Sequence, residues 1–195
     1  MINRDDVRAF IAIGLPEDLK SALREFEQKL RGPKSRCAKW VDPASIHLTL
    51  KSLGNVNSRV IEDIKKGLEV EVSSTHAFSL RTAETGCFPN VRRPRVFWIG
   101  LDGDIDVLLN LQSRIDQSTA KLGFPRENCP FQAHLTLARV RDDCGVAERE
   151  AFASLVSGVK FEPNKTIHVN AVSLIRSQLR PEGAVYTALA EYRMS

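Results

Sequence analysis

The tetrapeptide His-Leu-Thr-Leu occurs twice in the chain, at residues 47–50 and at residues 134–137. The two copies contain half of the protein's four histidines. In a β-strand, residues two positions apart share a face. The histidine and the threonine of each copy are therefore predicted to point to one side of a strand, while the two leucines face the core.

The same order of elements is predicted around each copy. The periodicity of apolar residues gives a helix opened by Pro16 and ended by Gly32-Pro33, and a helix capped by Asn57-Ser58. Two more helices are expected, one at Ile105–Leu122 with Leu109 among its inward-facing residues, and one at Val146–Val156. The expected strands are Val7–Ile13, Ile46–Leu53, Ala77–Ala83, Arg95–Leu101, Ala133–Val140, Thr166–Ile175 and Ala184–Tyr192.

A nearly constant offset relates the two halves. His134 lies 134 − 47 = 87 positions after His47, and Gly100 lies 100 − 14 = 86 positions after Gly14. The offset predicts an α+β, bilobal duplicated fold with two antiparallel-rich sheets facing each other across a central groove and helices outside. Residues 1–195 would form one domain of two pseudo-symmetric lobes with one motif each, joined by a loop at 84–94. The alternative is an unduplicated α/β protein, in which strands and helices also alternate.

The composition is typical of a soluble globular protein. With 43% hydrophobic and 27% charged residues, it excludes a disordered chain, a collagen-like fibre and a small disulfide-stabilised protein. The net charge of +4 favours anionic partners. No apolar run approaches the roughly 18 residues of a membrane span, the first residues are acidic, and the four cysteines lie far apart. We expect a cytoplasmic monomer with reduced thiols and no membrane contact.

Two histidines on facing strands suit phosphoryl chemistry. Because imidazole titrates near neutrality, one ring can accept a proton while the other donates one. On opposite sides of a phosphorus atom they can drive in-line displacement, and the hydroxyls of Thr49 and Thr136 can bind the non-bridging oxygens. The alternatives are structural histidines and a metal site. Two histidines without nearby carboxylates are a poor set of ligands for zinc, so no metal ion is predicted.

Further fragments accompany the two tetrapeptides in a specific order. They are residues 7–13, 46–51, 53–54, 88–90, 93–96, 130–131, 134–139 and 183–186. Over essentially its whole length the chain thus resembles the RNA 2′,3′-cyclic phosphodiesterases (LigT/ThpR proteins, once called 2′-5′ RNA ligases) of the two-histidine (2H) phosphoesterase superfamily. One departure is Ser52, where the family commonly has phenylalanine. Strand parity predicts that Ser52 faces the core.

The resemblance implies an RNA 2′,3′-cyclic 3′-phosphodiesterase that opens the cyclic phosphate ends of RNA to 2′-phosphates. His134 would be the proton acceptor, His47 the proton donor, and Thr49 and Thr136 would bind the phosphate. Members also resemble ligases that join tRNA halves through a 2′-5′ linkage without ATP. The sequence contains no Gly-x-x-x-x-Gly-Lys loop, and no cofactor is expected.

Other residues are candidates for contacts to the substrate. Arg139 would reach phosphate if its strand bends, and would otherwise be a solvated charge. Lys51, by parity on the side of His47, is a phosphate ligand or a lysine at the rim. Tyr186 and Phe131 would stack on the terminal base or ribose, or belong to the core.

Two further groups of residues are predicted outside the histidine strands. A basic lip for RNA, or a solvated loop, is predicted at Arg92, Arg93 and Arg95. Phe10 and Trp98 are predicted mainly in the core, whereas His76 and His168 are predicted to be structural or exposed. Two other functions remain open: a non-catalytic module that binds RNA ends or nucleotides, and a phosphodiesterase acting on a small cyclic nucleotide.

Overall fold

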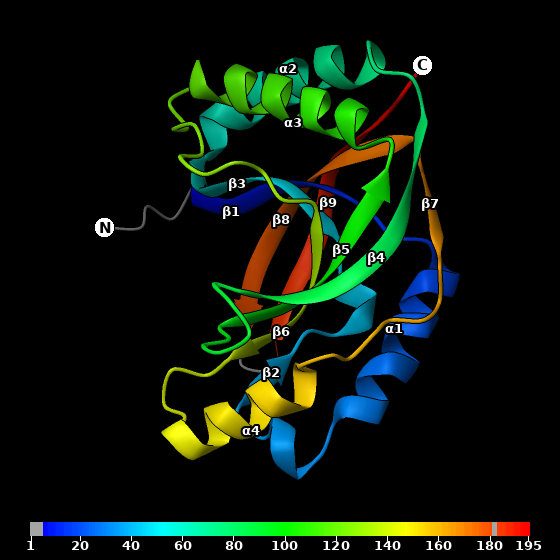
Figure 1. Cartoon of the computed structure of the whole chain (residues 1–195). Helices are drawn as coiled ribbons and strands as arrows, with labels where there is room; N and C mark the ends of the chain where they lie inside the picture. The colour runs from blue at the N-terminus through cyan, green and yellow to red at the C-terminus, as the bar shows by residue number, and fades with distance from the viewer. Residues whose placement is uncertain (1–5, 181–182) are drawn as a thin grey trace.

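The computed structural model describes residues 6–180 and 183–195, in which strands and helices alternate (Figure 1). The helices are α1 (Glu17–Leu30), α2 (Ile61–Ser73), α3 (Ile105–Ala120) and α4 (Val146–Val156). The strands are β1 (Asp6–Ile13), β2 (Ala38–Trp40), β3 (Leu48–Asn57), β4 (Phe78–Phe88), β5 (Val96–Gly103), β6 (His134–Val140), β7 (Thr166–Val169), β8 (Ala171–Arg180) and β9 (Gly183–Arg193).

The strands form two antiparallel sheets. The first sheet has the order β3-β1-β8-β9, and the second has the order β2-β6-β5-β4-β7. Every neighbouring pair is antiparallel. The histidine of the first tetrapeptide directly precedes β3, and the histidine of the second is the first residue of β6. Each of these strands pairs with the opening strand of its half, β3 with β1 and β6 with β5. The predicted α+β fold with two antiparallel sheets is confirmed.

The strands at the end of each half cross to the sheet of the other half. β4 lies in the second sheet, whereas β8 and β9 lie in the first. The predicted single strand Thr166–Ile175 was wrong for this reason. It is two strands, β7 and β8, and the chain passes from one sheet to the other at Asn170. Local apolar patterning carries no signal for such a change of partner.

The predicted inter-lobe loop at 84–94 was also wrong. Glu84–Phe88 is the end of β4, and the following residues turn back into β5 of the same sheet. Proline and glycine in this stretch mark a hairpin connection.

The helices follow the predicted stripes with one exception. α1 begins after Pro16 and buries Leu19 and Leu23 completely. In α3, Leu109 was expected to face inward but is 38% exposed, while Leu111 is fully buried. The two positions are two residues apart and so lie on opposite sides of a helix.

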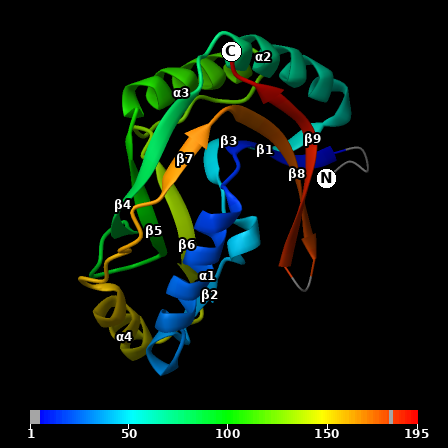
Figure 2. The ribbon, with the colours of Figure 1, turned by 90° about the vertical axis from the view of Figure 1, so that its right-hand side faces the viewer.

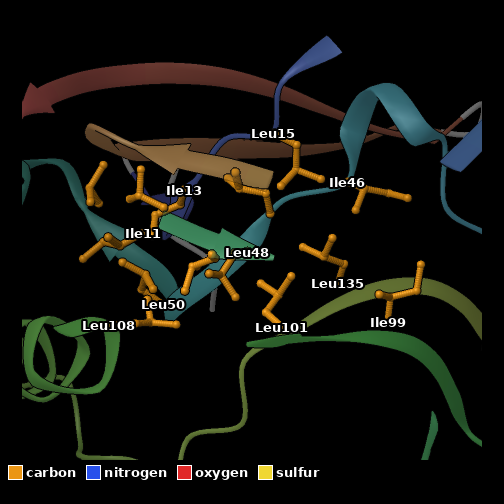
Figure 3. Close-up of a cluster of buried hydrophobic side chains, with 14 of the residues drawn as sticks. Ile11, Ile13, Leu15, Ile46, Leu48, Leu50, Ile99, Leu101, Leu108 and Leu135 are labelled. Carbon is orange, nitrogen blue, oxygen red and sulfur yellow. The ribbon is translucent and has the colours of Figure 1, made fainter. Parts of the chain in front are cut away.

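The two sheets share one hydrophobic core. Figure 3 shows Ile11 and Leu48 of the first sheet in the same cluster as Ile99 and Leu135 of the second. These four side chains are at most 1% exposed. Because the leucines that follow each histidine belong to this cluster, the core holds both motif strands in place.

The helices pack against the sheets at two ends of the molecule. α2 and α3 lie side by side at one end, and α4 lies at the other (Figure 2). The Gln112 side chain of α3 donates a hydrogen bond to the Leu50 carbonyl of β3 (3.3 Å), and Phe152 of α4 packs edge-on against Phe97 of β5. No helix within residues 6–180 and 183–195 is long and apolar enough to cross a membrane.

Candidate active site

A β-bulge interrupts each motif strand directly after its threonine. In β3, Thr49 pairs with Ala12 and Lys51 pairs with Ile11, so Leu50 is an extra residue. In β6, Thr136 pairs with Trp98 and Ala138 pairs with Phe97 in the same way. The extra residue there is Leu137, 87 positions after Leu50. An extra residue reverses the alternation of faces beyond it.

The bulges determine which residues farther along each strand lie on the same face as the histidine. Arg139 lies beyond the bulge of β6 and is brought to the face of His134 and Thr136. In β3 the equivalent residue is Ser52, which is exposed on the side of Thr49. The prediction that Ser52 faces the core was therefore wrong, because it assumed unbroken strand parity.

A groove of about 530 Å³ lies between the two motif strands. Thr49 and Ser52 line it from β3, and His134, Thr136 and Arg139 line it from β6. The segment that connects α3 to β6 forms another part of the wall. It contributes Glu127, Cys129, Pro130, Phe131 and Gln132. The groove thus brings both predicted threonines together with one histidine and the predicted arginine.

His47 directly precedes β3 but is not among the residues that line this groove. Its ring stacks on Phe10, with ring centres 4.5 Å apart, and meets the edge of Tyr186 at 5.4 Å. Tyr186 therefore lies beside His47 rather than with Phe131 in the groove. Phe131 is half-buried and packs partly against the core.

Both histidines make the same local hydrogen bond. Nδ1 of His47 lies 2.8 Å from the carbonyl oxygen of Ser45, and Nδ1 of His134 lies 2.7 Å from that of Gln132. A carbonyl oxygen only accepts, so each Nδ1 carries the hydrogen that it donates. In the neutral ring the lone pair is then on Nε2, which can accept a proton or, once protonated, donate one.

Burial shifts the acidity of both rings in the same direction. Desolvation lowers the pKa of His47 below its usual value of about 6.5, against the opposing effect of the bond to Ser45. Desolvation also lowers the pKa of His134, the bond to Gln132 opposes it, and the positive charge of Arg139 lowers it further. Both rings are therefore mainly neutral at pH 7 without substrate.

A buried ion pair supports the groove from behind. Lys51 is 2% exposed, and its Nζ donates to the Asp116 carboxylate of α3 and to the carbonyl of Pro125, both at 2.6 Å. Lys51 was expected on the side of His47 as a ligand or a lysine at the rim. The bulge instead turns it inward, where it joins β3 to α3 and to the segment that lines the groove.

The remaining predicted residues fall outside the groove. Arg92, Arg93 and Arg95 are exposed, and they stay candidates for a basic lip. His76 and His168 are exposed as predicted and bond to Ser195 and Ser79. Within the described residues, no three His, Cys, Asp or Glu side chains are placed to hold a metal ion.

Two aromatic residues near His134 were not predicted as site residues. Phe88 meets the edge of the His134 ring at 4.9 Å, and Trp98 lies 6.3 Å from it. Trp98 was expected in the core, but it is half-buried and lines a second cavity beside His134. The sequence contained part of the signal for Trp98. Trp98 and Gly100 are two positions apart and share a face of β5, and β5 pairs with the motif strand β6.

Comparisons with known proteins identify the family. The model of the LigT-like phosphoesterases matches the chain twice, over residues 13–98 and 99–186. The chain belongs to this family. The two consecutive matches agree with the duplicated fold, and the LigT-like assignment confirms the resemblance to the 2H phosphoesterases.

Relatives of this LigT-like phosphoesterase match over nearly its whole length. The RNA 2′,3′-cyclic phosphodiesterase of Methanothermobacter thermautotrophicus is 30% identical over 188 residues, 96% of this chain and 99% of that protein. The protein of the same name from Thermus thermophilus is 32% identical over 193 residues, 96% of this chain and 90% of that protein.

Solved structures show the same fold. A crystal structure of a protein from Thermus thermophilus has a TM-score of 0.79 and 30% identity, and the match covers 95% of this chain and 97% of that one. The crystal structure of Escherichia coli LigT complexed with 3′-AMP has a TM-score of 0.76 and 23% identity, with 97% and 99% covered.

The buried ion pair generates a stability prediction. Lys51→Met should lower the free energy of unfolding by about 3 kcal/mol at pH 7, because the Asp116 carboxylate loses its buried partner. Burial raises the pKa of Asp116, but the hydrogen bonds from Lys51 and Arg126 outweigh this effect and lower the pKa below its usual value. The stabilisation by the ion pair is therefore lost as pH falls and the carboxyl is protonated. Urea denaturation at pH 7 and pH 4 measures both effects. The control Lys66→Met, at an exposed position of α2, should change stability by less than about 0.5 kcal/mol. An equal change in both variants would contradict the assigned role.

The charge of Arg139 generates a titration prediction. In Arg139→Ala the pKa of His134 should rise, because a nearby positive charge no longer disfavours the imidazolium form. The pKa of His47, to which Arg139 does not contribute, should stay constant. NMR titration of the imidazole carbon-bound protons measures both values in one sample. An unchanged pKa of His134 would place Arg139 too far away to act on it.

Proposed function

We propose that the protein hydrolyses the 2′,3′-cyclic phosphate ends of RNA to 2′-phosphates, with His134 as general base and His47 as general acid. The names of the curated relatives support the substrate class. The single observation that carries the mechanism is the duplicated imidazole arrangement. Each Nδ1–H is bound to the carbonyl two residues earlier, and each Nε2 is left for proton transfer.

The reaction is an in-line displacement at phosphorus. A water oxygen attacks the phosphorus while its proton passes to Nε2 of His134. The bond between phosphorus and the 3′-oxygen breaks, and the Nε2–H of His47 protonates the leaving 3′-oxygen. Thr49 and Thr136 donate hydrogen bonds to the non-bridging oxygens, and the guanidinium of Arg139 offsets their negative charge. The product carries a 2′-phosphate and a 3′-hydroxyl.

The surroundings of the two rings support this division of roles. Arg139 lowers the pKa of His134 in addition to the effect of burial, and a base must be neutral before it can act. His47 has no such cationic neighbour among the causes of its shift. The negative charge of a bound phosphate would raise the pKa of His47 and favour the protonated acid.

The same groups would serve 2′-5′ ligation of tRNA halves. A 5′-hydroxyl would take the place of water, so no ATP is consumed. Both histidines come from one chain, which fits a monomer. We further propose that residues 1–195 form one domain of two pseudo-symmetric lobes, each with one motif at 47–50 or 134–137. The similar placement of the two bulges supports this division.

Removing either histidine tests the mechanism. His47→Ala and His134→Ala should each lower kcat by about 10³-fold, within the range that general acid–base catalysis contributes. His168→Ala is the matched control, because the ring of this exposed histidine lies outside the groove and bonds to Ser79, and its activity should equal that of the wild type. Circular dichroism checks that the variants fold. Full activity in either motif variant would reject the assigned roles.

The product and the pH profile test the chemistry. An RNA oligonucleotide ending in a 2′,3′-cyclic phosphate should yield a 2′-phosphate, with or without EDTA.

A plot of kcat/KM against pH should be bell-shaped, because activity rises as His134 loses its proton and falls as His47 loses its proton. Because kcat/KM reports the free enzyme and burial lowers both pKa values, both limbs of this profile should have their midpoints below pH 6.5. A 3′-phosphate product would mean that the 2′-oxygen leaves and that the assigned leaving group, the 3′-oxygen, is wrong. Binding without turnover would favour the non-catalytic module, and turnover of cyclic mononucleotides alone would favour a small substrate.

A further inference from the structure

The fold brings together two cysteines that are 107 positions apart in the chain. Cys37 directly precedes β2, and Cys144 lies in the connection between β6 and α4. The thiol of Cys144 donates a hydrogen bond to the carbonyl oxygen of Cys37 (3.5 Å), and the two thiol groups are also hydrogen-bonded to each other. Each sulfur atom therefore already contacts the residue to which a disulfide would join it.

Hydrogen bonds to the backbone hold both cysteines in place. The amide of Arg141 donates to the Cys37 carbonyl (2.9 Å), which extends the pairing of β2 with β6 by one residue pair. The guanidinium of Arg149 in α4 donates to three carbonyl oxygens within residues 141–144, at 2.9, 3.0 and 3.2 Å. The contact between the cysteines thus belongs to a connection that is tied both to β2 and to α4.

The two thiols differ in exposure and in surroundings. Cys37 is fully buried and donates to the Glu148 carbonyl of α4 (3.5 Å), and burial raises the pKa of its thiol to about 11. Cys144 is partly exposed, and the guanidinium of Arg141 donates a hydrogen bond to its sulfur. It also directly precedes Gly145, the N-cap of α4. A cationic neighbour and a helix N-terminus are surroundings in which cysteine sulfur reacts readily.

We propose that Cys37 and Cys144 form a reversible dithiol–disulfide pair, in which Cys144 reacts with a hydroperoxide and Cys37 completes the disulfide. First, the Cys144 thiolate attacks the terminal peroxide oxygen and becomes a sulfenic acid. The O–O bond breaks, and the other oxygen leaves and takes up the proton that Cys144 released. Next, the Cys37 sulfur bonds to the Cys144 sulfur, the S–O bond breaks, and the hydroxyl group leaves as water with the Cys37 proton. The two thiols are oxidised and the hydroperoxide is reduced.

The disulfide acts on the stability of the fold and on the fate of Cys144. It closes a loop of 107 residues, and a cross-link over such a loop stabilises the folded state by restricting the unfolded chain. It also protects the Cys144 sulfur from further, irreversible oxidation. Neither cysteine lines the groove between the motif strands. The pair is therefore a modification site separate from the proposed active site, and its tests need no turnover.

Mass spectrometry of the native protein tests the pair. Hydrogen peroxide followed by alkylation should yield a cross-linked peptide of Cys37 and Cys144 in the wild type, and dithiothreitol should restore both thiols. Cys37→Ser should instead keep Cys144 as a sulfenic acid that dimedone traps, and Cys144→Ser should leave Cys37 reduced. Cys129→Ser removes the exposed thiol of the chain and is the matched control, which should form the same cross-link. A folded wild type that gives no cross-linked peptide would overturn the proposal.

Thermal unfolding measures the effect of the disulfide. The oxidised wild type should unfold about 5–10 °C above the reduced wild type, as expected for a cross-link over a long loop. The difference should disappear with dithiothreitol and in Cys144→Ser. Because Cys37 is buried, Cys37→Ala is measured beside Cys37→Ser, and circular dichroism checks that both variants fold. Equal Tm values for the cross-linked and reduced wild type would contradict the assigned effect on stability.

Discussion

The β-bulge after each motif threonine is the constraint on which the site depends. In a regular strand, the residue five positions after a histidine would face away from it. The extra residue, Leu50 in β3 and Leu137 in β6, reverses the alternation. Arg139 is thereby placed with His134 and Thr136, while the leucines stay in the common core. A strand can in this way present three polar groups to a groove and still anchor itself on its other face.

The bulge in β3 has a second effect, because it turns Lys51 into the interior. A buried ammonium is costly unless it is paired, and Asp116 together with the Pro125 carbonyl satisfies it. The segment between α3 and β6 is held by this contact, and the same segment supplies Phe131 and Gln132 to the groove. Gln132 in turn accepts the hydrogen bond that orients His134. The stability of the core and the orientation of His134 are thus linked through one buried lysine.

The aromatic surroundings of the two histidines differ although the backbone is similar. His47 stacks on Phe10 and contacts Tyr186, whereas His134 lies beside Phe88 and Trp98. One side of the duplicated fold therefore encloses its histidine, and the other opens into a cavity lined by an indole.

The sequence alone determined the two motif strands, the order of most helices and strands, and the family, because apolar periodicity and the spacing of the two tetrapeptides are local properties. It placed the histidines, threonines and Arg139 as candidates for this reason. Only the tertiary structure decided the orientation of Ser52 and Lys51, the split of 166–175 between two sheets, and the position of Trp98. Each of these depends on which residue of a distant strand lies opposite. Strand register and bulges arise from pairing across the sheet, and no pattern within a single segment records them.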